Sequence, residues 1–162
     1  DLRSYGAGRS LDDNANVLLR YKNGATGSLW ASQCAPGHNN SLTIGVYGDK
    51  GSLEWNGEVN DYLTYNEYGK PPQTITRGGP GADAVAGHAT RMPAGHPEGY
   101  IEGFANLYSN AAEQIWARIE SRDPDALALD TPTVEDGAVG LKFITACVES
   151  SKNNSLWTSA SL

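Results

Sequence analysis

The chain has 162 residues, which is enough for one domain with a buried hydrophobic core. Its formal net charge is -7, and because no basic stripe interrupts this acidity, we exclude nucleic acid as a partner. Its apolar runs are far shorter than a bilayer requires, so we also exclude a segment that spans a membrane.

The first predicted element is a β-hairpin over residues 15–33, which follows an N-terminal entry loop. Asn23-Gly24 favours a two-residue type I′ turn, because both central positions of that turn need a positive φ. Such a turn would pair Val17 with Trp30. Since both faces of the hairpin carry apolar side chains, we expect its second face to be covered by another subunit.

Four further strands are predicted between this hairpin and the middle of the chain. They are short runs of apolar and β-branched residues separated by turn residues, at 41–47, 51–55, 62–66 and 73–76. Strands that follow one another through tight turns form an antiparallel meander. The first half of the chain is therefore predicted to be sheet.

A long amphipathic helix is predicted in the stretch 91–121, after a Gly/Ala-rich loop. Apolar side chains from Ile101 to Ile119 recur at the spacing of one helix face. Pro97 suits the first turn of this helix, where its missing N–H is not needed. The length and one-sidedness of the helix predict that its apolar face covers the sheet.

A second helix is predicted to begin after Thr133, which is a favourable N-cap residue with Asp136 three positions later. Together the elements predict an α+β fold in a single domain over residues 1–162. We expect an open, mostly antiparallel β-sheet with two helices packed on one face. The other face of the sheet is predicted to be an oligomer interface.

Several motifs that carry chemistry in other proteins are absent or incomplete. Gly6-Ala7-Gly8 and Gly79-Pro80-Gly81 come nearest to a dinucleotide fingerprint, but neither is predicted between a strand and an immediately following helix. The three histidines lack metal-ligand spacing, so we predict no metal site. Adjacent Asp12-Asp13 could be a carboxylate pair, or it could serve a turn or cap.

The two cysteines, Cys34 and Cys147, have no spacing typical of a zinc or redox motif. We interpret them as buried free thiols, with a disulfide as the alternative. Free thiols are typical of a reducing compartment, so we expect the protein to be cytoplasmic.

His96 is the strongest candidate for a residue that binds a substrate. It precedes Pro97 at the predicted helix start, where a neutral imidazole could hydrogen-bond a substrate hydroxyl. Its alternative role is to cap the helix or to pack in the loop. Arg91 and Tyr100 flank His96 and could line the same pocket.

Four stretches carry a resemblance to a known family. They are VLLRYKNGATGSLWAS, VYGDKGSLEW, GHPEGYIEGFANLY and TPTVEDGAVGLKFITACVESSKNN, in this order. Together they resemble the C-terminal domain of the Gfo/Idh/MocA oxidoreductases, the family of glucose–fructose oxidoreductase and the inositol dehydrogenases. The resemblance covers nearly the whole chain.

This resemblance implies an N-terminal Rossmann domain, absent from this chain, that binds NAD or NADP in the parent enzyme. The family's catalytic lysine lies in a Glu-Lys-Pro motif of that domain, whereas Gly69-Lys70-Pro71 lies in a predicted turn. The family's Asp-x-x-x-His pair has no counterpart here either. We therefore expect this chain to hold no catalytic residue, to bind no cofactor by itself and to be inactive alone.

The resulting hypothesis is that this chain is the C-terminal portion of an NAD(P)-dependent oxidoreductase that acts on a sugar, polyol or related CH–OH substrate. This portion would supply the substrate pocket and would form a homodimer or tetramer through the sheet face. The alternative is a non-catalytic binding or scaffold module that uses the same sheet.

Overall fold

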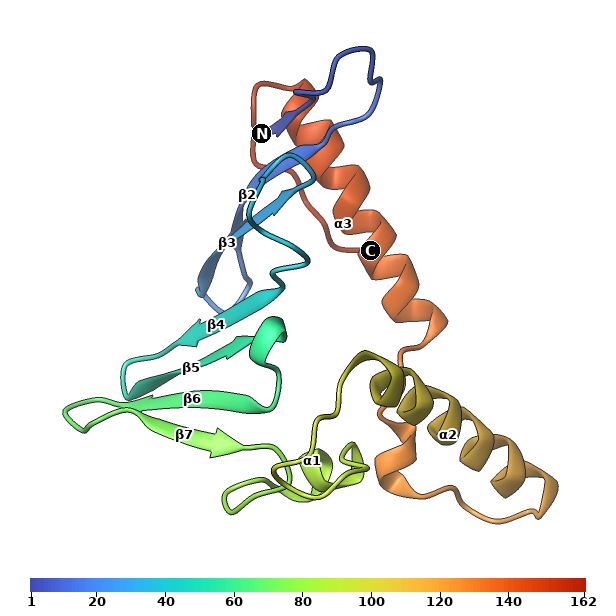
Figure 1. Ribbon diagram of the computed structural model, residues 1–162. Coiled ribbons are helices and arrows are strands. Elements are labelled where there is room, and N and C mark those ends of the chain that lie inside the picture. The colour runs from blue at the N-terminus through green and yellow to red at the C-terminus, as the bar shows by residue number, and fades with distance from the viewer. The chain divides into compact units, whose positions relative to one another are not determined.

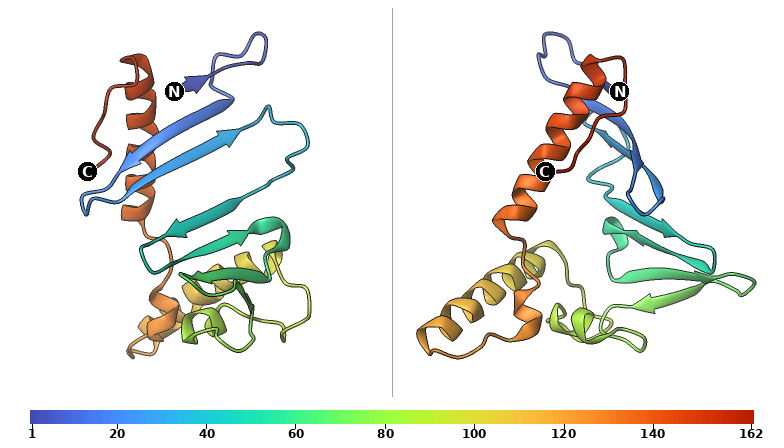
Figure 2. Two further views of the ribbon diagram at one scale, coloured as in Figure 1. Left: turned by 90° about the vertical axis from the view of Figure 1, so that its left-hand side faces the viewer. Right: turned by 180° about the vertical axis from the view of Figure 1, so that it is seen from behind.

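A computed structural model describes all of residues 1–162, which divide into two compact units. Unit 1 comprises residues 1–38 and 132–162, and unit 2 comprises residues 39–131. Each unit combines an open antiparallel sheet with helix, which confirms the predicted α+β class (Figures 1 and 2). The strands belong to two sheets, where one sheet was expected. None of the helices is long and apolar enough to cross a membrane.

Unit 1 is a three-stranded sheet in the order β1-β2-β3, together with helix α3. The elements are β1 (Leu2–Arg3), β2 (Asn14–Arg20), β3 (Thr26–Ser32) and α3 (Val134–Lys152). Strand β1 lies in the stretch that was predicted to be loop. The predicted capping box of α3 is present, because Asp136 N donates to Thr133 Oγ1 while Thr133 N donates to the Asp136 carboxylate.

The predicted register of the β2–β3 hairpin is wrong by one residue. Gly24 has a φ of +90°, but Asn23 has a negative φ, so a type I′ turn does not form. A three-residue loop forms instead, closed by a hydrogen bond of 2.9 Å from Tyr21 N to Ala25 O. Val17 consequently faces Leu29, and Trp30 belongs to the opposite face of the sheet.

Unit 2 is the predicted meander, a four-stranded sheet in the order β4-β5-β6-β7, with one short helix between β5 and β6 and the other helices after β7. The strands are β4 (Thr43–Tyr47), β5 (Gly51–Asn56), β6 (Tyr62–Glu67) and β7 (Gln73–Thr76). The helices are η1 (Gly57–Val59), α1 (Ala84–His88), α2 (Tyr100–Ile119) and η2 (Ala126–Leu129). The short helix α1 lies within the stretch predicted to be a Gly/Ala-rich loop.

One face of the β4–β7 sheet is apolar. Residue alternation places Ile44, Val46, Leu53, Trp55, Leu63, Tyr65 and Ile75 on this face. Serine, threonine and asparagine predominate on the other face. Ile44 and Val46 are 60% and 61% exposed, so this chain does not cover the outer strand of its own apolar face.

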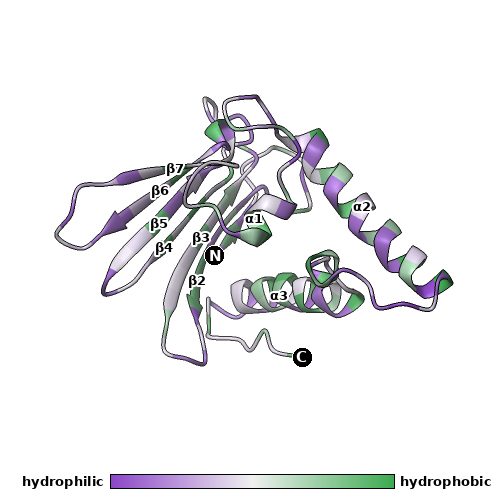
Figure 3. Cartoon of the chain, turned by 90° about the horizontal axis from the view of Figure 1, so that it is seen from below, coloured by the Kyte–Doolittle hydropathy of each residue, from purple (hydrophilic) through white to green (hydrophobic).

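Helix α2 begins at Tyr100, three residues later than Pro97, and its N-cap residue is Gly99. Its expected apolar face is not buried within the chain, because Ile101 is 78% exposed and Tyr108 is 75% exposed. Apolar and polar segments alternate along the helix (Figure 3). The side of α2 that is buried carries small and polar residues, and η2 packs against this helix.

Candidate functional site

The candidate site is the loop of residues 91–99, which leads into α2 in unit 2 and carries His96. We expected His96 at the helix start, but it lies four residues before Tyr100, so it is not in the first turn. The His96 imidazole is exposed, and its Nδ1 lies 3.3 Å from Pro93 O. It is therefore accessible to a ligand, but the helix N-terminus does not act on it as assumed.

The second candidate, Arg91, directs its guanidinium at α2. Its Nε donates to Asn106 Oδ1 at 2.6 Å. Its Nη2 donates to Ala105 O at 2.9 Å and to Ser109 Oγ at 2.5 Å. These contacts tie the beginning of the 91–99 loop to the middle of the helix.

The third candidate, Tyr100, is the first residue of α2 and is 82% exposed. Its ring contacts Phe104, with ring centroids 4.9 Å apart. The structure thus places Tyr100 and His96 at the same end of α2, where both side chains are open to solvent. The 91–99 loop and the first residue of α2 thus present an imidazole and an aromatic ring within five residues of each other.

The residue that sequence reasoning missed is Glu98, whose side chain is only 4% exposed. Its carboxylate accepts hydrogen bonds from Arg91 N at 2.8 Å and from Met92 N at 2.9 Å. Its backbone carbonyl accepts a hydrogen bond from Asn60 Nδ2 at 2.7 Å. The only signal in the sequence was a glutamate near a helix start, which suggests a partner of the helix dipole and not an anchor for a loop.

Glu98 also pairs with Arg77, which directly follows β7. Arg77 Nη1 lies 2.5 Å from Glu98 Oε2, and Arg77 Nε lies 2.6 Å from Asp61 Oδ1. The hydrogen bond that Arg77 donates to Asp61 and the charge of Glu98 raise the pKa of Arg77. The same guanidinium donates to Met92 O at 2.9 Å and to His96 O at 2.6 Å. The edge of the sheet is thereby connected to the 91–99 loop.

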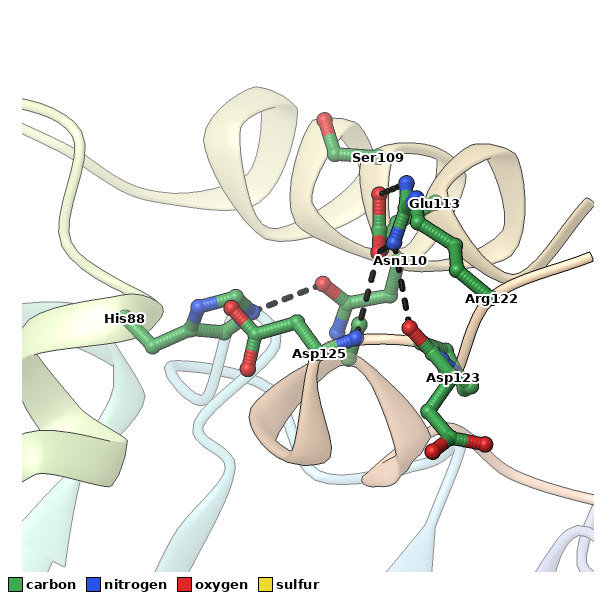
Figure 4. Close-up of a pocket in the computed structure, with 9 residues that line it drawn as sticks. His88, Ser109, Asn110, Glu113, Arg122, Asp123 and Asp125 are labelled. Carbon is green, nitrogen blue, oxygen red and sulfur yellow. Dashed lines mark hydrogen bonds and ion pairs between the residues drawn. The ribbon is translucent and has the colours of Figure 1, made fainter. Parts of the chain in front are cut away.

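A separate cavity of about 620 Å³ lies among the end of α1, α2 and the connector that leads to η2 (Figure 4). His88 points toward Asn110 there, with 2.8 Å between His88 Nε2 and Asn110 Oδ1. Arg122 and Glu113 form a two-pronged ion pair in its wall, with distances of 2.6 and 2.9 Å. None of His96, Arg91 and Tyr100 lines this cavity.

We predict that Glu113 titrates far below its ordinary value of 4.5. The Arg122 hydrogen bond, followed by the Asp125 backbone N–H, lowers the pKa of Glu113 to about 2. Because the folded pKa lies below the unfolded one, this carboxylate stabilises the fold above pH 4.5, and the contribution disappears as the pH falls toward 2. A carbon-13 NMR titration of the side-chain carboxyl should show a midpoint of about 2. In Arg122→Gln the midpoint should rise toward the ordinary value, and an unchanged midpoint would contradict the assignment.

Asp13 in unit 1 serves a turn, not a carboxylate pair. Its carboxylate accepts hydrogen bonds from Tyr5 N and Gly6 N, both at 2.8 Å, and these bonds lower the pKa of Asp13. Cys34 Sγ lies 3.4 Å from Asp13 Oδ1. Both cysteines of the chain are free, but Cys34 is exposed, so the expectation of two buried thiols is wrong for this residue.

The glycine motifs of the chain do not fit a dinucleotide. Gly8 lies in the loop between β1 and β2, and Gly81 precedes α1, a helix of only 5 residues. A dinucleotide site needs a strand, a glycine turn and a longer helix whose N-terminus faces the pyrophosphate. The chain also contains no group of three or more His, Cys, Asp or Glu residues that could hold a metal ion.

Comparisons with known proteins agree on one family. The family model described as "Oxidoreductase family, C-terminal alpha/beta domain" (GFO_IDH_MocA_C) matches residues 3–159. An uncharacterized oxidoreductase of Bacillus subtilis, YfiI, is 36% identical over 158 residues, which are 97% of this chain and 40% of that protein.

Solved structures show the same similarity. An oxidoreductase from Sinorhizobium meliloti is 48% identical with a TM-score of 0.91, covering 98% of this chain and 44% of that chain. An inositol dehydrogenase homolog from Azotobacter vinelandii, complexed with NADH and myo-inositol, is 32% identical with a TM-score of 0.88, covering 98% and 42%. The chain spans less than half the length of these relatives. It belongs to the Gfo/Idh/MocA oxidoreductase family and corresponds to its C-terminal alpha/beta domain.

Proposed function

We propose that this chain is the substrate-side portion of an NAD(P)-dependent dehydrogenase that oxidises a polyol or sugar. One observation carries the proposal: over 98% of its length the chain is 32% identical to an inositol dehydrogenase homolog that was solved with NADH and myo-inositol. The relatives are more than twice as long as this chain, so the activity belongs to a longer parent protein.

The proposed reaction removes a hydride from a carbon that bears a hydroxyl and leaves a carbonyl. A nicotinamide bound by the rest of the parent accepts the hydride, and a base outside residues 1–162 accepts the hydroxyl proton. The contribution of this chain is to bind and orient the substrate. His96 in the 91–99 loop and Tyr100 at the start of α2 are accessible and carry groups that can hydrogen-bond to hydroxyls.

Arg91 was expected to line the substrate pocket, but in this proposal it has a structural role. Its Nε and Nη2 are engaged by α2, so we assign Arg91 mainly to holding the loop. The apolar face of the β4–β7 sheet, which is exposed at Ile44 and Val46, supports a further element of the proposal, a homodimer or tetramer formed through that face. Two free cysteines support a cytoplasmic location.

The test is an assay of the full-length parent with NAD⁺ or NADP⁺ and a panel of cyclic polyols and monosaccharides. We expect reduced nicotinamide to appear with at least one of these compounds, as measured by its absorbance. A full-length protein that binds neither cofactor and oxidises none of the panel would favour a non-catalytic binding or scaffold module.

A further inference from the structure

The hydrogen bonds to the 91–99 loop are directed mainly at its backbone. Glu98 accepts from Arg91 N and Met92 N at the beginning of the loop. Arg77 donates to Met92 O and also to His96 O near its end. The loop is therefore closed by two side chains that bond to each other at 2.5 Å.

The Arg77–Glu98 pair differs from an ion pair whose only effect is to stabilise the fold. Charge pairing alone would need a single contact between the two groups, and Arg77 already has a second carboxylate partner in Asp61. The Glu98 carboxylate instead shares its oxygens between a guanidinium and two adjacent backbone amides. A carboxylate with three charge-assisted or backbone hydrogen bonds in a nearly buried position fixes its partners in one geometry.

His96 is one of the loop residues that stay exposed, and its imidazole carries hydrogen-bonding groups that a hydroxyl can use. Both the backbone N and the Nδ1 of His96 lie within hydrogen-bonding distance of Pro93 O, inside the same loop. Because Arg77 donates to His96 O, the Arg77–Glu98 pair holds the backbone from which the imidazole extends. Binding groups in enzymes need supporting residues that hold them to within a fraction of an ångström.

We propose that Glu98, together with Arg77, is a positioning residue that pre-organises the 91–99 loop for binding a polyhydroxyl substrate. This role rests on the proposed function, because it assumes that the loop faces the substrate. It requires no contact between Glu98 and the substrate. Glu98 acts through the amides of Arg91 and Met92 and through Arg77.

The test is Glu98→Gln in the full-length parent. The glutamine can keep one oxygen toward Arg77, but its NH₂ group then faces the Arg91 N–H, so the shorter of the two hydrogen bonds from Arg91 N is replaced by a contact between two donors. We expect hydrogen exchange at the Arg91 and Met92 amides to become at least about tenfold faster. We also expect the KM for the polyol to rise about tenfold or more while the Kd for NADH stays unchanged.

Asp61→Asn is the matched control, because Asp61 accepts from Nε of the same Arg77 guanidinium whose Nη1 donates to Glu98, but Asp61 does not touch the loop amides. It should alter neither the exchange of those amides nor the KM. Arg77→Lys is a second variant in case Glu98→Gln fails to fold. Lysine keeps the charge but lacks the planar fork that reaches Met92 O and His96 O, so the KM should rise here too.

The outcomes separate this proposal from the proposed function. A wild-type parent that oxidises no polyol would overturn the proposed function and, with it, the positioning role. An active parent whose Glu98→Gln variant keeps the wild-type KM would overturn the positioning role alone, whether or not the amides exchange faster. Equal effects of Glu98→Gln and Asp61→Asn on KM would also overturn it, because they would indicate a general loss of stability.

Discussion

Gly51→Ala is expected to destabilise the protein by about 3 kcal/mol, at the upper end of the range for overpacking a closely packed site. Gly51 begins β5 and lies opposite Glu67 of β6. A Cβ atom there would lie 2.3 Å from the backbone oxygen of Asn66. Because the obstacle is backbone and not the end of a flexible side chain, β5 and β6 must move apart or twist to accommodate the methyl group.

The matched control for this prediction is Gly103→Ala in α2. A Cβ atom at Gly103 meets nothing within 4 Å, and alanine is favoured over glycine in a helix by about 0.5–1 kcal/mol. Urea unfolding of the two variants should therefore give free-energy changes of opposite sign. Equal stability of Gly51→Ala and the wild-type chain would show that the strands are not packed as described.

His96→Ala should lower kcat/KM for the polyol about tenfold in the full-length parent, which is the usual effect of losing one hydrogen bond to a substrate. The imidazole is accessible at the end of α2 where Tyr100 is also exposed. The Kd for NADH should not change, since the cofactor is expected to bind outside this chain. The measurement is steady-state kinetics combined with a fluorescence titration of NADH.

His88→Ala is the control for removing an imidazole. His88 is also exposed, but it contacts Asn110 at the separate cavity and does not belong to the 91–99 loop. We expect this variant to keep the wild-type kcat/KM. If His96→Ala keeps the wild-type value for every polyol tested, His96 has only a packing role in its loop.

The sequence predicted the elements whose signals are local. β7 has the predicted bounds, and Thr133 caps α3 with Asp136 as its partner. These features depend on residues within a few positions of each other, so pattern and capping rules suffice. The predicted register of the β2–β3 hairpin was wrong because Asn23-Gly24 is compatible with two loops of different length, and in the longer loop that forms only Gly24 takes a positive φ.

The site was predicted only in part, because its organisation depends on distant residues. His96 and Tyr100 were proposed from their place at the predicted helix start, and the structure leaves both side chains exposed. The partnership of Glu98 with Arg77 joins positions 21 residues apart, and Asp61 lies a further 16 residues upstream. No helical or strand period connects such positions, so only the fold brings these charges together.

The burial of α2 was also predicted incorrectly for a physical reason. An amphipathic pattern shows that a helix face needs an apolar partner, but it does not say which chain or segment supplies that partner. Ile101 and Tyr108 are mostly exposed here, and the apolar face of the β4–β7 sheet is open at Ile44. Exposed apolar surfaces of this kind are expected of a chain that spans less than half the length of its relatives.

The most direct test of the central claim is a crystal structure of the full-length parent with NADH and a cyclic polyol. We predict that a ring hydroxyl lies within about 3.2 Å of an imidazole nitrogen of His96, the outer limit of a good hydrogen bond. We also predict that residues outside 1–162 hold the pyrophosphate of the cofactor. A polyol bound away from the 91–99 loop, or a pyrophosphate held at Gly8 or Gly81, would contradict the account.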